Sequence, residues 1–225
     1  MQRAYQDRKL GSQSFENFNH YIRSTKHHLG PRSSLFLSTM ATGKKTAIVT
    51  GGAGGIGSAF TKRLIQRGYR VVLADWNKQL GAEVQAELGE DILFVYCDVT
   101  SWESQAAMFK KACEWGGHID LFIANAGIEE REHFYQIPDQ NGEPIKPNTA
   151  VIDINLYSTI YGLRLFRHYN QKSKREGEFS RMFITTSLAG LYPFPAAPIY
   201  SVAKHGVSSF YQSLKRFLLS PSRRS

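Results

Sequence analysis

The sequence feature that most constrains the fold is a glycine-rich turn at residues 50–57 (TGGAGGIG). It follows an apolar run at residues 45–50 and opens a stretch whose apolar positions recur at helical spacing. A strand, a glycine-rich turn and a helix N-terminus form an anion site, because glycines let the backbone approach a pyrophosphate that the first helical N–H groups face. The turn therefore predicts a dinucleotide-binding α/β protein. The residues expected to line the cofactor here are Thr50, Gly51, Gly55, Ile56 and Gly57.

Short apolar runs alternate with amphipathic stretches from residue 44 onwards. Continuous β-branched strands separated by helices imply a parallel sheet covered on both faces, which is a Rossmann-type, doubly wound, three-layer α/β domain. The expected strands are 45–50, 70–75, 92–97, 119–124 and 181–186, and the expected helices are 55–68, 77–89, 101–115, about 148–171 and about 198–218. Asn77 and Ser101 are the expected N-caps of the second and third helices.

The folded pattern predicts one domain over residues 41–218, followed by a tail at 219–225. Residues 1–40 are polar, rich in Ser, Arg and His, and poor in acids. A disordered extension is the favoured interpretation, with a mitochondrial transit peptide and a translation start at Met40 as the alternatives. The longest apolar runs are strand-sized, so no membrane span is expected, and the favoured location is cytoplasmic.

The formal net charge of +9 comes from the two ends of the chain. Residues 1–40 hold six basic and two acidic side chains, residues 215–225 hold four basic and no acidic ones, and the stretch between has 18 against 17. A nucleic-acid protein would carry its excess on the folded domain, so nucleic-acid binding is not favoured. Cys97 and Cys113 lack paired spacing, and we expect neither a disulfide nor a metal site.

The second expected strand ends in an acid, Asp75, which lies 18 residues after Gly57. A carboxylate at that place can accept hydrogen bonds from the adenosine ribose hydroxyls and would repel a 2′-phosphate. The turn contains no Arg or Lys, and Lys78 is the nearest cation after Asp75. The sequence therefore favours NAD, with NADP as the alternative cofactor.

A candidate catalytic group lies on the last expected helix, where Tyr200 and Lys204 are four residues apart and share a face. Ser187 follows the fifth strand at its carboxyl end, where open α/β sheets bind their ligands. A lysine ammonium near a phenol favours the phenolate. Such a tyrosine can exchange a proton with an alcohol or a carbonyl while hydride moves to or from a nicotinamide, and the serine hydroxyl can hold the reacting oxygen.

Together these motifs resemble the short-chain dehydrogenase/reductase family over roughly residues 41–218. Within the family, the chain is most similar to NAD-linked alcohol dehydrogenases of the 15-hydroxyprostaglandin dehydrogenase type. The motifs that carry the resemblance, in chain order, are Thr50-Gly51-x-x-x-Gly55-x-Gly57, Asp98, Asn125-Ala126-Gly127, Asn155, Ser187 and Tyr200-x-x-x-Lys204.

The resemblance implies roles for residues that spacing alone does not assign. Asp98, with Val99, would contact the adenine end of the cofactor, and Asn125, Ala126 and Gly127 would steady the central sheet beside it. Asn155, Ser187, Tyr200 and Lys204 would form a catalytic tetrad, in which Asn155 positions a water that extends the proton relay from Lys204; Tyr200 and Lys204 would also touch the cofactor. Without the resemblance, Asn155 would be interpreted as a helix-interior polar residue paired with backbone. The resemblance also implies a homo-oligomer.

One departure from the family concerns the C-terminus, because only 21 residues follow Lys204 where the family adds two further strands and a substrate-covering loop. We expect the fifth strand to be a sheet edge. The favoured function is an NAD(P)-dependent oxidoreductase acting on an alcohol or ketone, with a truncated, non-catalytic NAD(P)-binding or interaction protein as the alternative. The apolar residues 191–195 and 134–135 permit an apolar or aromatic, secondary-metabolite or lipid-type substrate, although ordinary loop packing explains them equally well.

Overall fold

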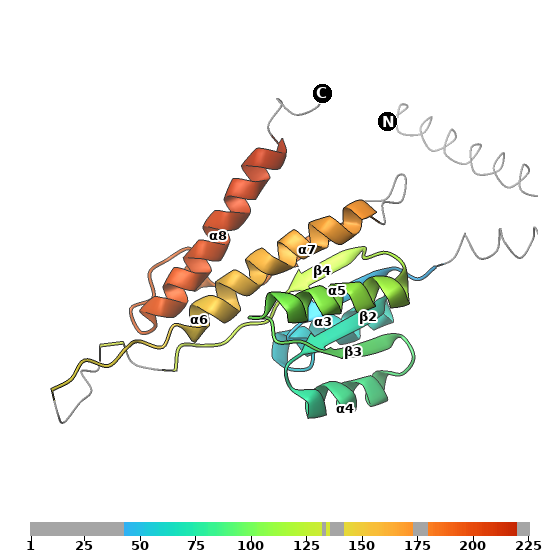
Figure 1. Cartoon of the computed structure of the whole chain (residues 1–225), viewed down its shortest axis with the longest axis horizontal. Helices are drawn as coiled ribbons and strands as arrows, with labels where there is room; N and C mark the ends of the chain where they lie inside the picture. The colour runs from blue at the N-terminus through green and yellow to red at the C-terminus, as the bar shows by residue number, and fades with distance from the viewer. Residues whose placement is uncertain (1–42, 132–133, 136–141, 173–179, 220–225) are drawn as a thin grey trace, which may run out of the picture. The chain divides into compact units, whose positions relative to one another are not determined.

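Five parallel strands form the sheet at the centre of the fold, in the order β3-β2-β1-β4-β5 (Figure 1). The computed structural model describes residues 43–131, 134–135, 142–172 and 180–219, so the predicted extension at 1–40 and most of the tail lie outside the described residues. All described elements belong to one compact unit that begins at Lys44. The strands are β1 (Thr46–Thr50), β2 (Arg70–Asp75), β3 (Ile92–Tyr96), β4 (Leu121–Ala124) and β5 (Arg181–Ile184).

The helices connect these strands by crossovers, as a doubly wound fold requires. They are α3 (Gly55–Gln66), α4 (Lys78–Leu88), α5 (Trp102–Gly116), α6 (Ala150–Ile152), the π-helix η1 (Asp153–Tyr157), α7 (Ser158–Lys172), the 3₁₀ helix η2 (Leu188–Gly190) and α8 (Pro198–Leu219). The predicted fold class is confirmed, and each predicted strand and helix is present with ends displaced by at most two residues. Asn77 and Ser101 cap α4 and α5 as predicted, each accepting a backbone N–H three residues ahead.

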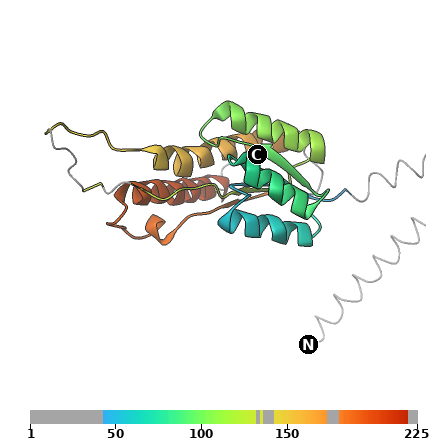
Figure 2. The same cartoon turned by 90° about the horizontal axis from the view of Figure 1, so that it is seen from below.

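The two faces of the sheet are covered by different helices because side chains alternate along each strand. Ile48, Val72 and Phe122 pack with α5 and α7, whereas Val49 and Leu73 pack with α3 and α4. Figure 2 shows α5 and α7 along one side of the sheet and α3 along the other. These layers bury every residue of β1, which explains why its middle residues 47–49 are apolar without alternation.

The strand β5 is less covered than the others, as expected of the last strand in the order. Met182 and Ile184 pack against the α5 and α7 side, while Phe183 on the opposite side is 55% exposed. Among the described residues, no strand lies beyond β5. The carboxyl edge of the sheet, where β1, β4 and β5 end together, is therefore the place at which the predicted site residues meet.

One helical region differs from its prediction in kind. The sequence predicts a single helix over about 148–171, and the structure has α6, a five-residue π-helix and α7 in its place. A π turn inserts one extra residue per turn and re-aims the side chains within it. Asn155 lies in this turn, and its side chain is buried.

Candidate active site

The glycine-rich turn leaves the start of α3 open to a ligand. Gly51 and Gly55 adopt φ values of 63° and 49°, which L side chains rarely adopt. Gly57 touches the turn so closely that an added Cβ would lie 1.9 Å from the Gly51 carbonyl oxygen. Gly54 is the N-cap, no side chain caps the helix, and its first turn holds no acid. The first N–H groups of α3 thus remain available to an anion.

The carboxylate of Asp75 joins the end of β2 to this turn. Its Oδ2 accepts a hydrogen bond from the Ala53 N–H at 3.1 Å, and its Oδ1 accepts one from the Asn77 N–H at 3.0 Å. The side chain is 8% exposed, whereas that of the adjacent Trp76 is 77% exposed. Lys78, the nearest cation, lies with its Nζ 4.7 Å from the centre of the Tyr96 ring.

Asp98 and Val99 lie at the start of the turn between β3 and α5. Asp98 is exposed, and its Oδ1 accepts hydrogen bonds from the Thr100 N–H at 2.9 Å and from the Thr100 hydroxyl at 2.7 Å. The Val99 side chain is buried, and its carbonyl oxygen accepts from the Gln105 side chain. Asp98 therefore shapes this turn, and the Val99 carbonyl oxygen anchors it to α5.

Asn125 connects three strands at the carboxyl edge of the sheet. Its Nδ2 donates to the carbonyl oxygen of Thr50 at 3.2 Å, and its Oδ1 accepts from the Thr185 hydroxyl at 3.1 Å. The Thr50 hydroxyl oxygen accepts from the N–H groups of Asn125 and Ala126. Asn125 thus ties the glycine-rich turn after β1 to the residue that follows β5.

The buried side chain of Asn155 is held by the backbone that follows Gly127. Its Oδ1 accepts from the Ile128 N–H at 2.8 Å, and its Nδ2 donates to the Ile128 carbonyl oxygen at 2.9 Å. A Cβ placed on Gly127 would lie 3.2 Å from Asn155 Oδ1 and 3.7 Å from Lys204 Nζ. Gly127 therefore lies between Asn155 and Lys204.

Tyr200 and Lys204 share one face of α8, and Lys204 points toward the end of β5. Its Nζ donates to the Thr185 carbonyl oxygen at 3.1 Å and lies 5.6 Å from the centre of the Tyr200 ring. Lys204 is only 4% exposed, and this burial lowers its pKa below the ordinary lysine value by removing water from the ammonium form. Ser187 caps η2 by accepting the Ala189 N–H at 3.2 Å.

The structure therefore brings most of the predicted tetrad to one edge. Asn155 and Lys204 flank Gly127, and Tyr200 lies against Lys204. Ser187 is half-buried at the same end of the sheet, in the segment that leads from β5 to α8. A buried amine beside a phenol, with an amide group close by, can exchange protons with a bound hydroxyl or carbonyl group.

Comparison with known proteins identifies the family. The sequence model of the short chain dehydrogenases matches residues 45–220. The chain belongs to this family. Similar proteins include the rat and human 15-hydroxyprostaglandin dehydrogenases [NAD(+)], 34% and 33% identical over 174 residues, and a short-chain dehydrogenase/reductase (prx7) of Penicillium rubens, 33% identical over 167 residues. The alignments to the two mammalian enzymes cover 75% of this chain and 60% of each relative, and the fungal one covers 72% and 59%.

Two solved structures carry the same fold. A short-chain dehydrogenase/reductase of Burkholderia phymatum in complex with NAD superposes with a TM-score of 0.66 at 28% identity, covering 76% of this chain and 59% of the other. A 3-ketoacyl-(acyl-carrier-protein) reductase of Brucella melitensis complexed with NADH gives 0.67 at 22% identity, covering 76% and 68%. The chain therefore spans about 60% of the length of the curated relatives that it matches.

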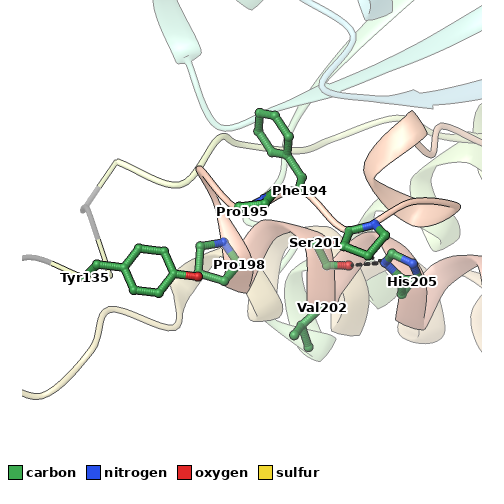
Figure 3. Close-up of a pocket in the computed structure, with 8 residues that line it drawn as sticks. Tyr135, Phe194, Pro195, Pro198, Ser201, Val202 and His205 are labelled. Carbon is green, nitrogen blue, oxygen red and sulfur yellow. Dashed lines mark hydrogen bonds between the residues drawn. The ribbon is translucent and has the colours of Figure 1, made fainter.

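The two aromatic segments noted in the sequence meet beside α8. Tyr135 and residues 193–195 line a pocket of about 360 Å³ together with Pro198, Ser201, Val202 and His205 (Figure 3). Pro198, Val202 and His205 lie roughly 140–200° around the helix from Tyr200, at about 100° per residue. None of the tetrad residues lines the pocket. It therefore opens on a face of α8 other than the one that carries the tetrad.

Sequence reasoning missed four residues at this edge. Ile128 holds the Asn155 side chain, Thr185 accepts the Lys204 amine, and Glu130 Oε2 accepts the Tyr200 N–H at 2.9 Å. These contacts join positions 19 to 70 residues apart, and no local sequence pattern predicts them. Trp76 is different, because an exposed aromatic residue directly after Asp75 is visible in the sequence.

In the described part of the chain, no helix is long and apolar enough to cross a membrane. Within the same residues, no group of three or more His, Cys, Asp and Glu side chains is arranged to hold a metal ion. Cys97 is buried, and this burial raises the pKa of its thiol to about 11.

Proposed function

We propose that this short-chain dehydrogenase interconverts an alcohol and a carbonyl compound with NAD as its cofactor. The observation that carries the proposal is the buried Lys204 amine, which lies between the Tyr200 ring and the end of β5 at the same edge as the open glycine-rich turn. A nucleotide bound at the turn and a proton-exchanging tyrosine at that edge are the two requirements of hydride-transfer chemistry. The relatives named after NAD(+) support the choice of cofactor.

The residues of the turn fit a dinucleotide. The uncapped start of α3 offers its N–H groups to the pyrophosphate, and nothing lies within 4 Å of the position where a Gly55 Cβ would be. We assign Thr50, Gly51, Gly55, Ile56 and Gly57 to this contact. Asp75 would accept the ribose hydroxyls with the lone pairs that its backbone bonds leave. Lys78, engaged with Tyr96, offers no separate support for a 2′-phosphate, which favours NAD over NADP.

The remaining proposed contacts follow the carboxyl edge of the sheet. Asp98 and the backbone of Val99 would border the adenine. Trp76, exposed beside Asp75, offers its ring to the same base. The segment formed by Asn125, Ala126 and Gly127, together with Tyr200 and Lys204, would border the nicotinamide end.

A bound nicotinamide supplies the hydride donor or acceptor. The Tyr200 hydroxyl would take the proton of a substrate alcohol as the carbonyl forms, and would return it in the reverse direction. Lys204 favours the phenolate by its charge, and its lowered pKa makes its ammonium a better proton donor to the relay. Ser187 would hold the reacting oxygen, and Asn155 would place the water that connects Lys204 with solvent.

We propose an apolar or aromatic secondary alcohol or ketone of lipid or secondary-metabolite type as the substrate. Support comes from Leu188, 74% exposed directly after Ser187, and from Leu191 and Tyr192, which are 60% and 68% exposed in the same segment. These side chains give the neighbourhood of Ser187 an apolar surface that a polar substrate would not complement. The pocket of Figure 3 does not enter this proposal, because it lies on another face of α8.

The second candidate function is a non-catalytic cofactor-binding or interaction protein. The observation in its favour is the partly exposed strand β5, on which Phe183 is 55% exposed. We also propose a homo-oligomer, which the family resemblance implies, and Val202 exposes apolar surface on α8. Light scattering at micromolar concentration checks the assembly, and a monomer would count against it.

Fluorescence titration of the full chain with NADH, combined with turnover of apolar secondary alcohols and NAD, tests the proposal. Tyr200→Phe removes only the hydroxyl, so turnover should fall at least about a hundredfold while NADH affinity stays within about threefold of the parent. Tyr211→Phe, at a 51% exposed position about three turns further along the same helix, is the matched control and should change neither. NADH binding without turnover by the parent would favour the second candidate, and absence of NADH binding would reject the enzyme and leave only an interaction protein.

A further inference from the structure

The helix that carries the tyrosine and lysine of the proposed site begins without a cap of its own. Ala197, directly before α8, has no polar side chain, and Pro198 has no N–H group. The first turn of α8 also holds no acid. Helix starts leave four N–H groups without intrahelical partners, and polar side chains normally satisfy some of them.

A residue from a distant part of the chain supplies this cap. Glu130, which follows β4, accepts the Tyr200 N–H on its Oε2 at 2.9 Å. Its other oxygen, Oε1, is buried and has no hydrogen-bond partner among the described residues. A carboxylate at a helix N-terminus is stabilised by the helix dipole, which explains how this acid is held at the start of α8 rather than in water.

Glu130 belongs to a short segment, residues 127–130, that also contacts the π-helix η1. Within residues 127–130, Gly127 lies against Asn155 and Lys204, and Ile128 holds the Asn155 amide with two hydrogen bonds. Two residues further, Glu130 holds the Tyr200 backbone. Residues 127–130 therefore fix the positions of Asn155 and Tyr200 relative to each other.

We propose that Glu130 is a positioning residue that fixes the start of α8, and with it the Tyr200 phenol, against the segment that holds Asn155. This inference rests on the proposed function for its catalytic consequence. Loss of the cap releases the first turn of α8, so Tyr200 leaves its place although its own side chain is unchanged. Glu130 touches no reacting group and acts only through the Tyr200 backbone.

Three single variants of the full chain test this role. Glu130→Ala removes the acceptor, Glu130→Gln keeps a carbonyl oxygen at nearly the same place, and Glu129→Ala is the matched control because Glu129 is the exposed neighbour. Amide hydrogen exchange at Tyr200 reports the cap directly. We expect faster exchange at Tyr200 in Glu130→Ala, and parent-like protection in Glu130→Gln and Glu129→Ala.

Steady-state kinetics measure the consequence for the proposed reaction. In Glu130→Ala we expect kcat to fall by about ten- to a hundredfold, since a misplacement of about 1 Å has this effect, while NADH affinity stays within about twofold. Glu130→Gln should regain most of the loss. Parent-like exchange at Tyr200 in Glu130→Ala, or a kcat equal to that of Glu129→Ala, would overturn the proposal. A parent without turnover would refute the proposed function, and the exchange comparison would still decide the cap.

Discussion

Replacement of Gly57 by alanine is expected to damage both the fold and cofactor binding. A Cβ at this position would lie 1.9 Å from the Gly51 carbonyl oxygen and 2.7 Å from the Asn125 amide nitrogen. An unstrained contact between carbon and a carbonyl oxygen needs roughly 3.3 Å, so the start of α3 must move away from the turn by about 1.4 Å. The obstacle is backbone, which cannot rotate aside as a flexible side chain can.

Overpacking of this kind costs about 1–3 kcal/mol, which lowers the Tm by roughly 2–12 °C for a domain of this size. The displacement also separates the N–H groups of α3 from the turn that should cradle the pyrophosphate. We therefore expect NADH affinity to fall at least about tenfold. Thermal unfolding followed by circular dichroism gives the first quantity, and fluorescence titration with NADH gives the second.

Gly54→Ala is the matched control within the same turn. Its φ of −127° is open to any residue, and its Cβ would meet only the Leu80 side chain, at 3.8 Å. Alanine is a poorer N-cap than glycine, so a loss of about 0.5–1 kcal/mol is expected, with little change in NADH affinity. Parent-like unfolding and NADH binding by Gly57→Ala, or equal damage from Gly54→Ala, would contradict this prediction.

Two further predictions concern Lys204 and Trp76. Burial lowers the pKa of Lys204 in the folded protein. Between that lowered pKa and the ordinary lysine pKa of about 10.4, the unfolded chain therefore binds more protons than the folded one. The contribution of Lys204 to the free energy of unfolding consequently rises with pH across this window. Lys204→Met should therefore be more stable than the parent below this window, and the advantage should disappear as pH rises through it. Chemical denaturation at several pH values measures this, and a stability difference between the two proteins that does not change with pH contradicts the prediction. Trp76→Ala should weaken NADH binding about tenfold through lost stacking on the adenine. Trp102, 40% exposed at the start of α5, provides the control, and Trp102→Ala should leave NADH affinity unchanged. Equal NADH affinities of the two variants would remove Trp76 from the proposed site.

Much of the fold follows from local pattern, because each strand and helix carries its own signal. The β1–turn–α3 unit is an example: buried β-branched residues, then glycines where positive φ is needed, then a helical stripe ending in Gln66. The face shared by Tyr200 and Lys204 likewise follows from a spacing of four residues. These features are short-range, and sequence spacing is sufficient to place them.

Other features of the site depend on contacts that spacing does not encode. The π turn around Asn155 has no compositional signature and breaks what the periodicity predicts as one helix. Glu130 caps a helix 70 residues away, so its role is visible only once the segment after β4 is seen to meet the start of α8. The aromatic segments at Tyr135 and Phe194 do come together, but on a face of α8 that local pattern could not identify.

The nucleotide-binding half and the proton-transfer half of the proposed site are packed against the rest of the fold to different extents. The nucleotide half rests on β1 and β2, whose buried residues are covered by helices on both faces. The proton-transfer half rests on α8, which is tied to the sheet through the Lys204 bond to Thr185 and the close approach of Gly190 to the Lys204 carbonyl oxygen. Local stability follows buried contacts, so cofactor binding should survive perturbations that displace Tyr200. We therefore expect the proposed cofactor binding and turnover to be separable, with contacts such as that of Glu130, rather than the glycine-rich turn, deciding whether turnover accompanies binding.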